Sequence, residues 1–142
     1  MSKVYFSLQE AESMVTKLKK KIERVAQLRE EILILDNTKI FFDNANMENL
    51  LLEVQLSKNF HEKNLEMFSL ITEIVQEGCI VRNIDDFEVD FYYKLKDKDI
   101  FLCWKRGELN ISFWHEMTET AKQRKPIKQI QQNYYEQLKQ LR

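Results

Sequence analysis

The fold is decided by the stretch FEVDFYYKL, residues 87–95, where the spacing of apolar side chains changes. Before this stretch, apolar residues recur every three or four positions, which is typical of helices with one buried side. From Val89 onward they alternate with polar residues, which is typical of strands with one buried face. The sequence therefore predicts helices before this point and a sheet after it.

Two long helices are predicted before the change of period. Ser7-Leu8-Gln9-Glu10 matches a capping box, and apolar residues then alternate three and four apart, as in a coiled coil, to about residue 35. A second helix is expected to begin at N-caps within 43–46 and to end at Gly78, since glycine favours a left-handed cap. We predict an antiparallel helical hairpin over residues 7–77.

The second predicted helix carries two apolar stripes, and each is wide enough to need a packing partner. We expect these partners to be the first helix and the sheet. The first stripe contains Met47, Leu51, Val54, Leu65, Phe68 and Val75, and the second contains Leu56, Phe60, Met67, Ile71 and Ile74.

A three-stranded antiparallel meander is predicted within residues 79–116, with a short fourth strand beginning at Cys79. A two-residue loop at 106–107 would pair Trp104 with Leu109 and Ile100 with Phe113. A loop at 96–99 would pair Phe91 with Trp104. Both registers place apolar residues opposite apolar residues.

The remaining residues predict a last helix with Pro126 at its first position. Its apolar face would be formed by Ile127, Ile130, Tyr134, Leu138 and Leu141. We therefore predict an α+β fold: a long antiparallel helical hairpin packed on a small antiparallel β-meander, with a C-terminal amphipathic helix. Residues 1–125 are expected to form one domain and residues 126–142 the basic helix.

Composition and charge restrict the setting of the protein. The chain has 142 residues and a net charge of −1, and it lacks both a signal-peptide pattern and a run of about 20 apolar residues. The two cysteines, Cys79 and Cys103, are too few for a disulfide scaffold, so we expect reduced thiols, a cytoplasmic location and no membrane partner. Six basic residues against Glu136 alone after residue 119 give the C-terminal helix a positive charge, which allows nucleic-acid binding.

Several ordered motifs resemble a known family. They are Phe6-Ser7-Leu8-Gln9-Glu10-Ala11, the stretch 78–85, Val89-Asp90-Phe91, Leu102-Cys103-Trp104, Gly107-Glu108, Trp114-His115-Glu116 and Arg124-Lys125-Pro126-Ile127. Together they resemble the prokaryotic family catalogued as Domain of Unknown Function 2203, over residues 6 to about 127. The resemblance implies a shared fold and brings no established activity.

The strongest chemical candidates fall within these motifs. Asp90, Cys103, His115 and Glu116 offer the thiolate, imidazole and carboxylate groups that zinc prefers. The predicted register, however, places Cys103 and His115 on opposite faces unless a bulge intervenes, so we assign these residues structural roles and expect no metal and no cofactor. A row of opposite charges from Asp90 through Lys105 to Glu108 is explained in the same way, as cross-strand pairing.

The second sheet face is also predicted to carry aromatic and polar residues, including Tyr92, Cys103 and Asn110 in one row. Such a face needs cover from the protein itself, another subunit or a ligand. A small-molecule cleft beneath Trp114 with Arg124 as anion partner is one interpretation of it. We expect His61 to be a core or boundary residue and the basic cluster at 17–24 to be a solvated helix face.

Three functions follow as hypotheses. The first is a non-enzymatic interaction or assembly module that binds a second copy or another protein. The second is a small-molecule or metal-dependent enzyme using the region of Cys103, His115 and Glu116. The third is an RNA- or ribosome-associated protein acting through its basic C-terminal helix. The candidate functional surface consists of Asp90, Cys103, Glu108, Trp114, His115, Glu116 and Arg124.

Overall fold

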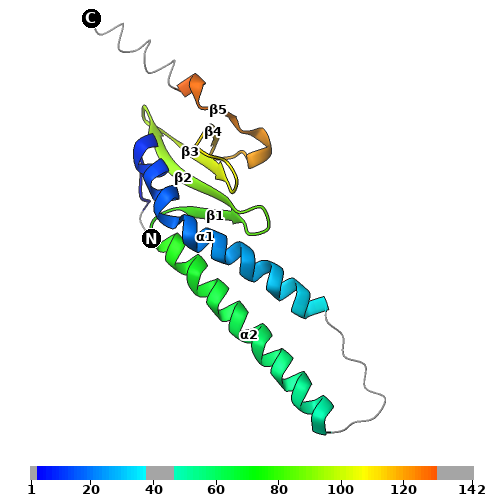
Figure 1. The fold of residues 1–142 in the computed structure, drawn as a ribbon. Coiled ribbons are helices and arrows are strands. Elements are labelled where there is room, and N and C mark those ends of the chain that lie inside the picture. Colours follow the sequence, from blue (N-terminus) through cyan, green and yellow to red (C-terminus); the bar gives the residue numbers. More distant parts are fainter. Residues whose placement is uncertain (1–2, 38–46, 131–142) are drawn as a thin grey trace, which may run out of the picture.

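The chain forms two long helices followed by an antiparallel sheet, as the sequence predicts (Figure 1). The computed structural model describes residues 3–37 and 47–130. Helix α1 spans Leu8–Asn37 and helix α2 spans Met47–Gln76. The strands are β1 (Ile80–Asn83), β2 (Glu88–Leu95), β3 (Lys98–Lys105), β4 (Phe113–Glu116) and β5 (Lys125–Pro126), with a 3₁₀ turn, η1, at Ala121–Gln123. The predicted α+β class, helical hairpin and meander are confirmed.

The described helix ends follow the predicted local signals. The backbone N–H of Ser7 donates to Glu10 Oε1, and the N–H of Glu10 donates to Ser7 Oγ, both at 3.1 Å, so the capping box before α1 is formed. After α2, Gly78 has φ +103°, and a Cβ at this position would lie 2.7 Å from Cβ of Val4. Glycine is therefore required by both backbone conformation and space. The N-caps predicted within 43–46 lie outside the described residues.

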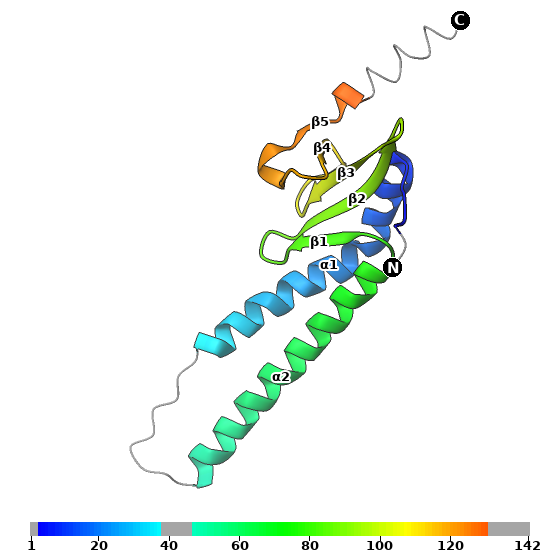
Figure 2. The same cartoon turned by 180° about the vertical axis from the view of Figure 1, so that it is seen from behind.

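Helix α1 lies between α2 and one face of the sheet, while the far ends of both helices extend beyond the sheet (Figures 1 and 2). Its buried stripe consists of Ala11, Val15, Leu18, Ile22, Val25, Leu28 and Ile32. This stripe joins strand residues such as Phe91 and Leu102, both 0% exposed, in one apolar core. The stripe is buried against both α2 and the sheet, and this burial of apolar surface stabilises the packing of the helices on the sheet.

The predicted basic cluster of α1 pairs with α2. Lys17 contacts Glu77 at 3.1 Å, Lys21 contacts Glu73 at 3.2 Å, and Arg24 contacts Glu66 at 2.7 Å. Exposed pairs of this kind contribute about 0–1 kcal/mol each, so they orient the helices more than they stabilise them. Part of the cluster therefore forms ion pairs with α2 and the turn after it, whereas Lys19 and Lys20 are exposed, as expected for a solvated helix face.

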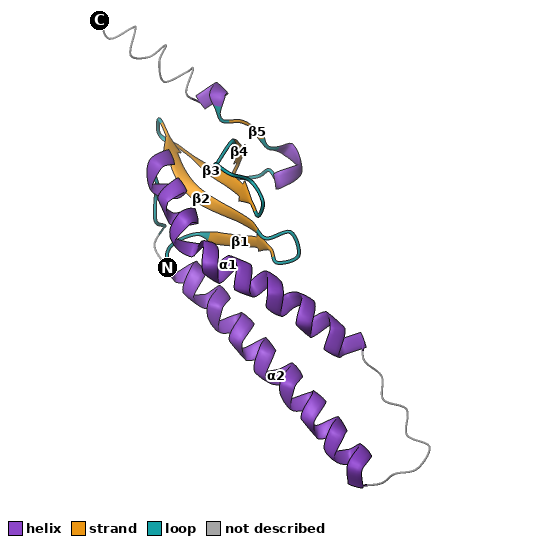
Figure 3. Ribbon diagram, in the orientation of Figure 1, coloured by secondary structure: helices purple, strands orange, loops and turns teal. Residues whose placement is uncertain are grey.

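The sheet has five strands in chain order, β1 to β5, seen as arrows in Figure 3. The hairpin of β2 and β3 differs from the prediction in register. Strands β2 and β3 are joined by a two-residue turn in which Lys96 has φ 57°, so Phe91 pairs with Leu102 and Val89 with Trp104. The predicted pairing of Phe91 with Trp104 is therefore wrong by two positions. Because side chains alternate with a period of two, this shift leaves every residue on its predicted face.

The predicted register of the next hairpin, between β3 and β4, is wrong by three positions, and this odd shift changes which face each residue lies on. Leu102 pairs with Trp114 and Phe101 with His115, whereas the prediction paired Leu102 with Ile111. Residues 108–112 form a loop instead of a strand, and the Trp104 Nε1–H donates to the Glu108 carbonyl at the start of this loop, at 3.0 Å. An odd shift exchanges the two faces of the strand, so His115 lies on the face predicted for Trp114 and Trp114 on the face predicted for His115.

The strand after the meander replaces part of the predicted last helix. Pro126 pairs with Phe113 in β5, so it does not occupy the first position of a helix. The predicted face residues Tyr134, Leu138 and Leu141 lie outside the described residues, as does most of the basic helix on which the nucleic-acid hypothesis depends. Across residues 3–37 and 47–130, neither long helix has the length and continuous apolarity needed to cross a bilayer.

Candidate functional site

A buried polar cluster lies on the sheet face opposite α1. It consists of Asp90 from β2, Cys103 from β3 and His115 from β4, which are 1%, 0% and 2% exposed. Their ligand-type atoms all lie within 4.8 Å of one another. The prediction that Cys103 and His115 point to opposite faces is therefore wrong, and no bulge is needed to bring them together.

The imidazole of His115 is fixed at both nitrogens. Its Nδ1 lies 2.9 Å from the carbonyl oxygen of Glu116, and its Nε2 lies 3.0 Å from Oδ2 of Asp90. A carbonyl can only accept, so Nδ1 carries a proton and donates it to Glu116. The ring edge with Nε2 is consequently directed at Asp90.

The carboxylate of Asp90 has two oxygens in different surroundings. Oδ2 accepts from Nε2 of His115 and from Nε of Arg82, each at 3.0 Å. Oδ1 is buried and has no hydrogen-bond partner among the described residues. A buried acceptor without a partner costs about 1–3 kcal/mol or more when charged, so this oxygen is the unsatisfied point of the cluster.

The charge of His115 follows from these contacts. Burial alone would lower the pKa of His115, but hydrogen bonds to Asp90, Cys103 and the Glu116 carbonyl raise the pKa to about 10. The imidazole is therefore protonated at neutral pH and donates from Nε2 to the Asp90 carboxylate. Asp90 thus has two cationic neighbours, His115 and Arg82.

Arg124 and Glu108 form a second pair beside the cluster. Nη1 and Nη2 of Arg124 lie 2.9 and 3.0 Å from the two carboxylate oxygens of Glu108, which gives a bidentate contact. Burial lowers the pKa of Arg124, but Glu108 and the adjacent Cys103 raise it, with a net increase. The guanidinium also lies 4.0 Å from the ring of Phe113, so Arg124 covers the β4 side of the cluster.

The predicted charge row is rearranged in the structure. Glu88, and not Asp90, pairs with Lys105, at 3.5 Å, and Asp90 is the cross-strand partner of Cys103. Glu108 lies in the loop after β3 and accepts from the Lys105 backbone N–H at 2.7 Å. The predicted row of Tyr92, Cys103 and Asn110 is also not formed, since Tyr92 pairs with Phe101.

Two candidate residues lie away from the cluster. Trp114 is 8% exposed and belongs to the apolar core, whereas Arg124, the predicted anion partner of a cleft beneath Trp114, lies over Phe113 and is paired with Glu108. The Glu116 side chain binds Lys98 at 2.7 Å, and only its backbone carbonyl contacts His115. Of the predicted surface, the structure brings together Asp90, Cys103, Glu108, His115 and Arg124.

Arg82 was not among the predicted site residues. It lies on β1, in the motif stretch 78–85, and its guanidinium is 4.9 Å from the Phe101 ring centre. Ile80 is the cross-strand partner of Asp90, so alternation on β1 would have placed Arg82 on the same face. Alternation on β1 alone does not identify Arg82, because its position beside Asp90 also depends on the β1–β2 register, which the sequence analysis did not predict.

Basic side chains over aromatic rings cover part of the second face. Rings of Tyr92, Phe101 and His115 form a line with centre separations of 4.8 and 5.4 Å. Lys3 lies over Tyr92, Arg82 over Phe101 and Arg124 over Phe113. Part of the cover that the second sheet face was expected to need therefore comes from basic side chains of the chain itself, through cation–π contacts.

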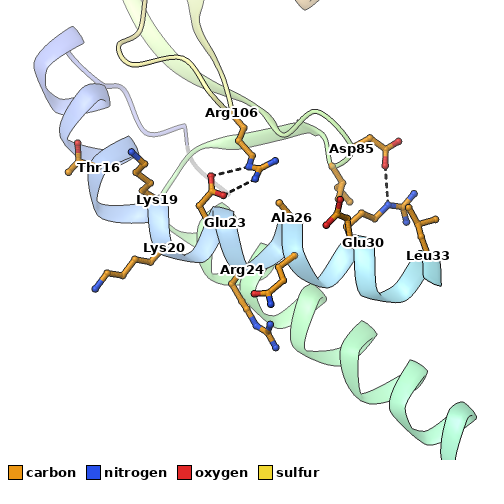
Figure 4. Close-up of a pocket in the computed structure, with 13 residues that line it drawn as sticks. Thr16, Lys19, Lys20, Glu23, Arg24, Ala26, Glu30, Leu33, Asp85 and Arg106 are labelled. Atoms are coloured by element: carbon orange, nitrogen blue, oxygen red, sulfur yellow. Dashed lines mark hydrogen bonds and ion pairs between the residues drawn. The ribbon is translucent and has the colours of Figure 1, made fainter. Parts of the chain in front are cut away.

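An open groove of about 1150 Å³ lies along α1, where residues that follow β1 and β3 approach the helix (Figure 4). Figure 4 shows Glu23 and Arg106 directed at each other across it, and their contacts are 2.8 and 2.9 Å. Arg29 and Asp85 form another pair at its end, at 3.0 Å. Several of the charged side chains that line the groove therefore already have ionic partners within the chain.

A third feature is the exposed seam of α2, which we define as Met47, Leu51, Val54, Leu65 and Phe68. These side chains are 57–69% exposed, whereas Met67 and Ile74 on the other stripe are buried. The expectation that both stripes pack within the molecule is wrong, because the sheet packs on α1 and leaves the seam uncovered by the described residues. Lys58 and His61 occupy the same helical line between its two apolar parts.

Comparison with known proteins places the chain in a family without assigning an activity. The family described as "Uncharacterized conserved protein (DUF2203)" matches residues 4–127. No curated protein matches the chain, and no solved structure matches it. Asp90, Cys103, Glu108, His115 and Arg124 each lie in a separate motif of the family resemblance described above.

Proposed function

The chain belongs to the DUF2203 family, whose description names no activity, and we propose from the geometry of its helices that it is a non-enzymatic assembly module. The observation that carries this proposal is the exposed seam of α2. Single exposed apolar residues are ordinary, but an aligned row on one helix marks an interaction surface. The occupant that we propose is the same seam of a second copy.

The spacing of the seam supports a helical partner. Its residues follow one another at intervals of four and three positions, and the same line continues through Lys58 and His61 to Leu65 and Phe68. This is the heptad spacing with which one helix packs against another. Two hairpins joined in this way would form a four-helix arrangement.

The charges on the seam support antiparallel pairing of the two copies. In a parallel pair, Lys58 would face Lys58 of the second copy, and like charges at such a position are unfavourable. In an antiparallel pair centred on His61, Lys58 lies opposite Leu65, and Val54 lies opposite Phe68. Larger and smaller side chains then alternate across the contact.

The size of the seam sets the expected strength of the dimer. In this arrangement the seam pairs with itself from Val54 to Phe68, which extends about 21 Å, and a helix with side chains is about 10 Å wide, so each copy contributes on the order of 200 Å². Standard stable interfaces use about 800 Å² per partner. The dimer is therefore expected to be reversible and to dissociate on dilution.

The test is sedimentation equilibrium of the full chain over a wide concentration range. The wild type should change from monomer to dimer, and Phe68→Glu should remain monomeric at every concentration. The matched control is Leu109→Glu, because Leu109 is also apolar, is 94% exposed and lies on the loop after β3. This control should dimerise like the wild type.

Orientation is tested with a mixture of Val54→Cys and Phe68→Cys chains under mild oxidation. Antiparallel pairing predicts a mixed disulfide dimer, whereas parallel pairing predicts disulfides only between identical variants. A wild-type chain that stays monomeric at high concentration, or a Phe68→Glu chain that dimerises like the wild type, would contradict the proposal.

A further inference from the structure

We infer that Asp90, Cys103 and His115 form a binding site for one divalent transition-metal ion of the zinc class. This inference is separate from the assembly proposed above, since the site lies on the second sheet face and the seam lies on α2. It rests on the arrangement of three donor groups from three strands.

The first argument is the spacing of the donors. The ligand atoms of the three residues lie within 4.8 Å of one another. Zinc bonds to nitrogen, oxygen and sulfur are about 2.0–2.3 Å long, so donors of one tetrahedral site lie about 3.3–3.8 Å apart. Side-chain movements of about 1 Å would therefore bring all three donors to bonding distance, without a change in strand pairing.

The second argument is the orientation of His115. Its Nδ1–H donates to the Glu116 carbonyl at 2.9 Å, and its Nε2 is directed at Asp90. Histidines that bind metals almost always hold the outer nitrogen in this way, which fixes the ring. In the metal-free chain Nε2 carries the proton that it donates to Asp90, so binding of the ion would release this proton, together with that of the Cys103 thiol, to the solvent. Here the strand backbone supplies that support.

The third argument is independent of the histidine. Oδ1 of Asp90 is buried without a hydrogen-bond partner among the described residues, although the side chain is 1% exposed. Arg82 holds the other oxygen, Oδ2, at 3.0 Å. A cation bound by Oδ1 would satisfy the one acceptor that the cluster leaves open.

The donor types select the class of ion. A thiolate and an imidazole favour zinc or cobalt, whereas magnesium and calcium prefer sites built from oxygen alone. Three protein donors leave the fourth tetrahedral position to a small ligand such as water.

The experiment uses the full chain after treatment with a chelator, titrated with Co²⁺ and then with Zn²⁺. We expect a thiolate-to-cobalt charge-transfer band that saturates at one Co²⁺ per chain and disappears when Zn²⁺ is added. The absence of this band, or a titration without saturation, would overturn the inference.

Cysteine variants locate the site. Cys103→Ser should lose the charge-transfer band, whereas Cys79→Ser should keep it, because Cys79 is equally buried but lies in the core on the other face. Loss of the band in Cys79→Ser with retention in Cys103→Ser would refute the assignment.

Arg82→Ala provides a second test if Cys103→Ser does not fold. Its side chain is 46% exposed and contacts only the outer side of the carboxylate, so all three donors remain. Zinc affinity should fall roughly 10–100-fold, as is usual when an outer partner of a ligand is removed. Unchanged affinity would contradict the inferred site. Phe68→Glu should bind Co²⁺ like the wild type, which separates this inference from the proposed dimer.

Discussion

The imidazole Nε2 of His115 lies 3.0 Å from Oδ2 of Asp90, although their strands, β4 and β2, are not neighbours in the sheet. Strand β3 lies between them, and Cys103 is the cross-strand partner of Asp90. One ionic contact therefore connects strands across an intervening one. Its removal should affect the whole second face.

Asp90→Asn should destabilise the chain by about 3–5 kcal/mol, because it leaves His115 and Arg82 beside a neutral amide, and loss of one member of a buried ion pair is costly. Urea unfolding followed by circular dichroism measures this change. The control is Asp85→Asn, which breaks an exposed pair with Arg29 and should cost less than about 1 kcal/mol. Equal effects would show that Asp90 carries no buried charge interaction.

Stability of the metal-free chain should fall between about pH 6.5 and pH 10. The pKa of His115 is raised to about 10 in the folded state and is close to 6.5 in the unfolded chain, so the stabilisation is complete below pH 6.5 and lost as pH rises to 10. Each pH unit in this range costs up to about 1.4 kcal/mol. Thermal melting at a series of pH values checks this, and His115→Gln should show a flatter profile.

Both cysteines should resist thiol reagents in the folded chain. Both side chains are buried and so are inaccessible to the reagent, and burial also raises the pKa of Cys79 to about 11, so little reactive Cys79 thiolate forms. A chromogenic disulfide should titrate both thiols only after denaturant is added. Rapid reaction of either thiol in buffer would show that its burial is incomplete.

Leu28→Ala should cost about 2–5 kcal/mol, since Leu28 is 0% exposed on the stripe of α1 that faces the core. Leu109→Ala, at a side chain that is 94% exposed, should change stability by less than about 0.5 kcal/mol. Chemical denaturation of both variants compares the two positions. A change of less than about 0.5 kcal/mol at Leu28 would show that the packing of α1 at this position contributes little to the free energy of unfolding.

The sequence predicted the secondary structure far better than the site. The apolar period and the capping residues located both helices, and the alternation of apolar and polar residues located β2 and β3. These signals succeed because they depend only on residues close together in the sequence. The Phe91 register was wrong by two positions without changing any face, whereas the His115 register was wrong by three and reversed the face. The loop at 108–112 accepts a hydrogen bond from Trp104 at Glu108, which apolar alternation does not reveal.

The seam of α2 shows a different limit of sequence reasoning. Both stripes were correctly identified as apolar, and Met67 and Ile74 are buried as expected. Nothing in the pattern indicates that the sheet would pack on α1 and leave Leu51 and Phe68 uncovered. Choice of partner is decided by tertiary packing, which periodicity does not specify.

The strictly sequential strand order, β1 to β5, has a consequence for synthesis of the chain. Each strand is translated after the neighbour on which it pairs, so β3 can join the sheet before β4 exists. A sheet that formed in the order of synthesis would leave Cys103 without the cover of His115 and Arg124, and open to oxidants and metals, until those residues were made. Closure of the cluster by residues 115 and 124 would then be among the last steps that protect the nascent sheet.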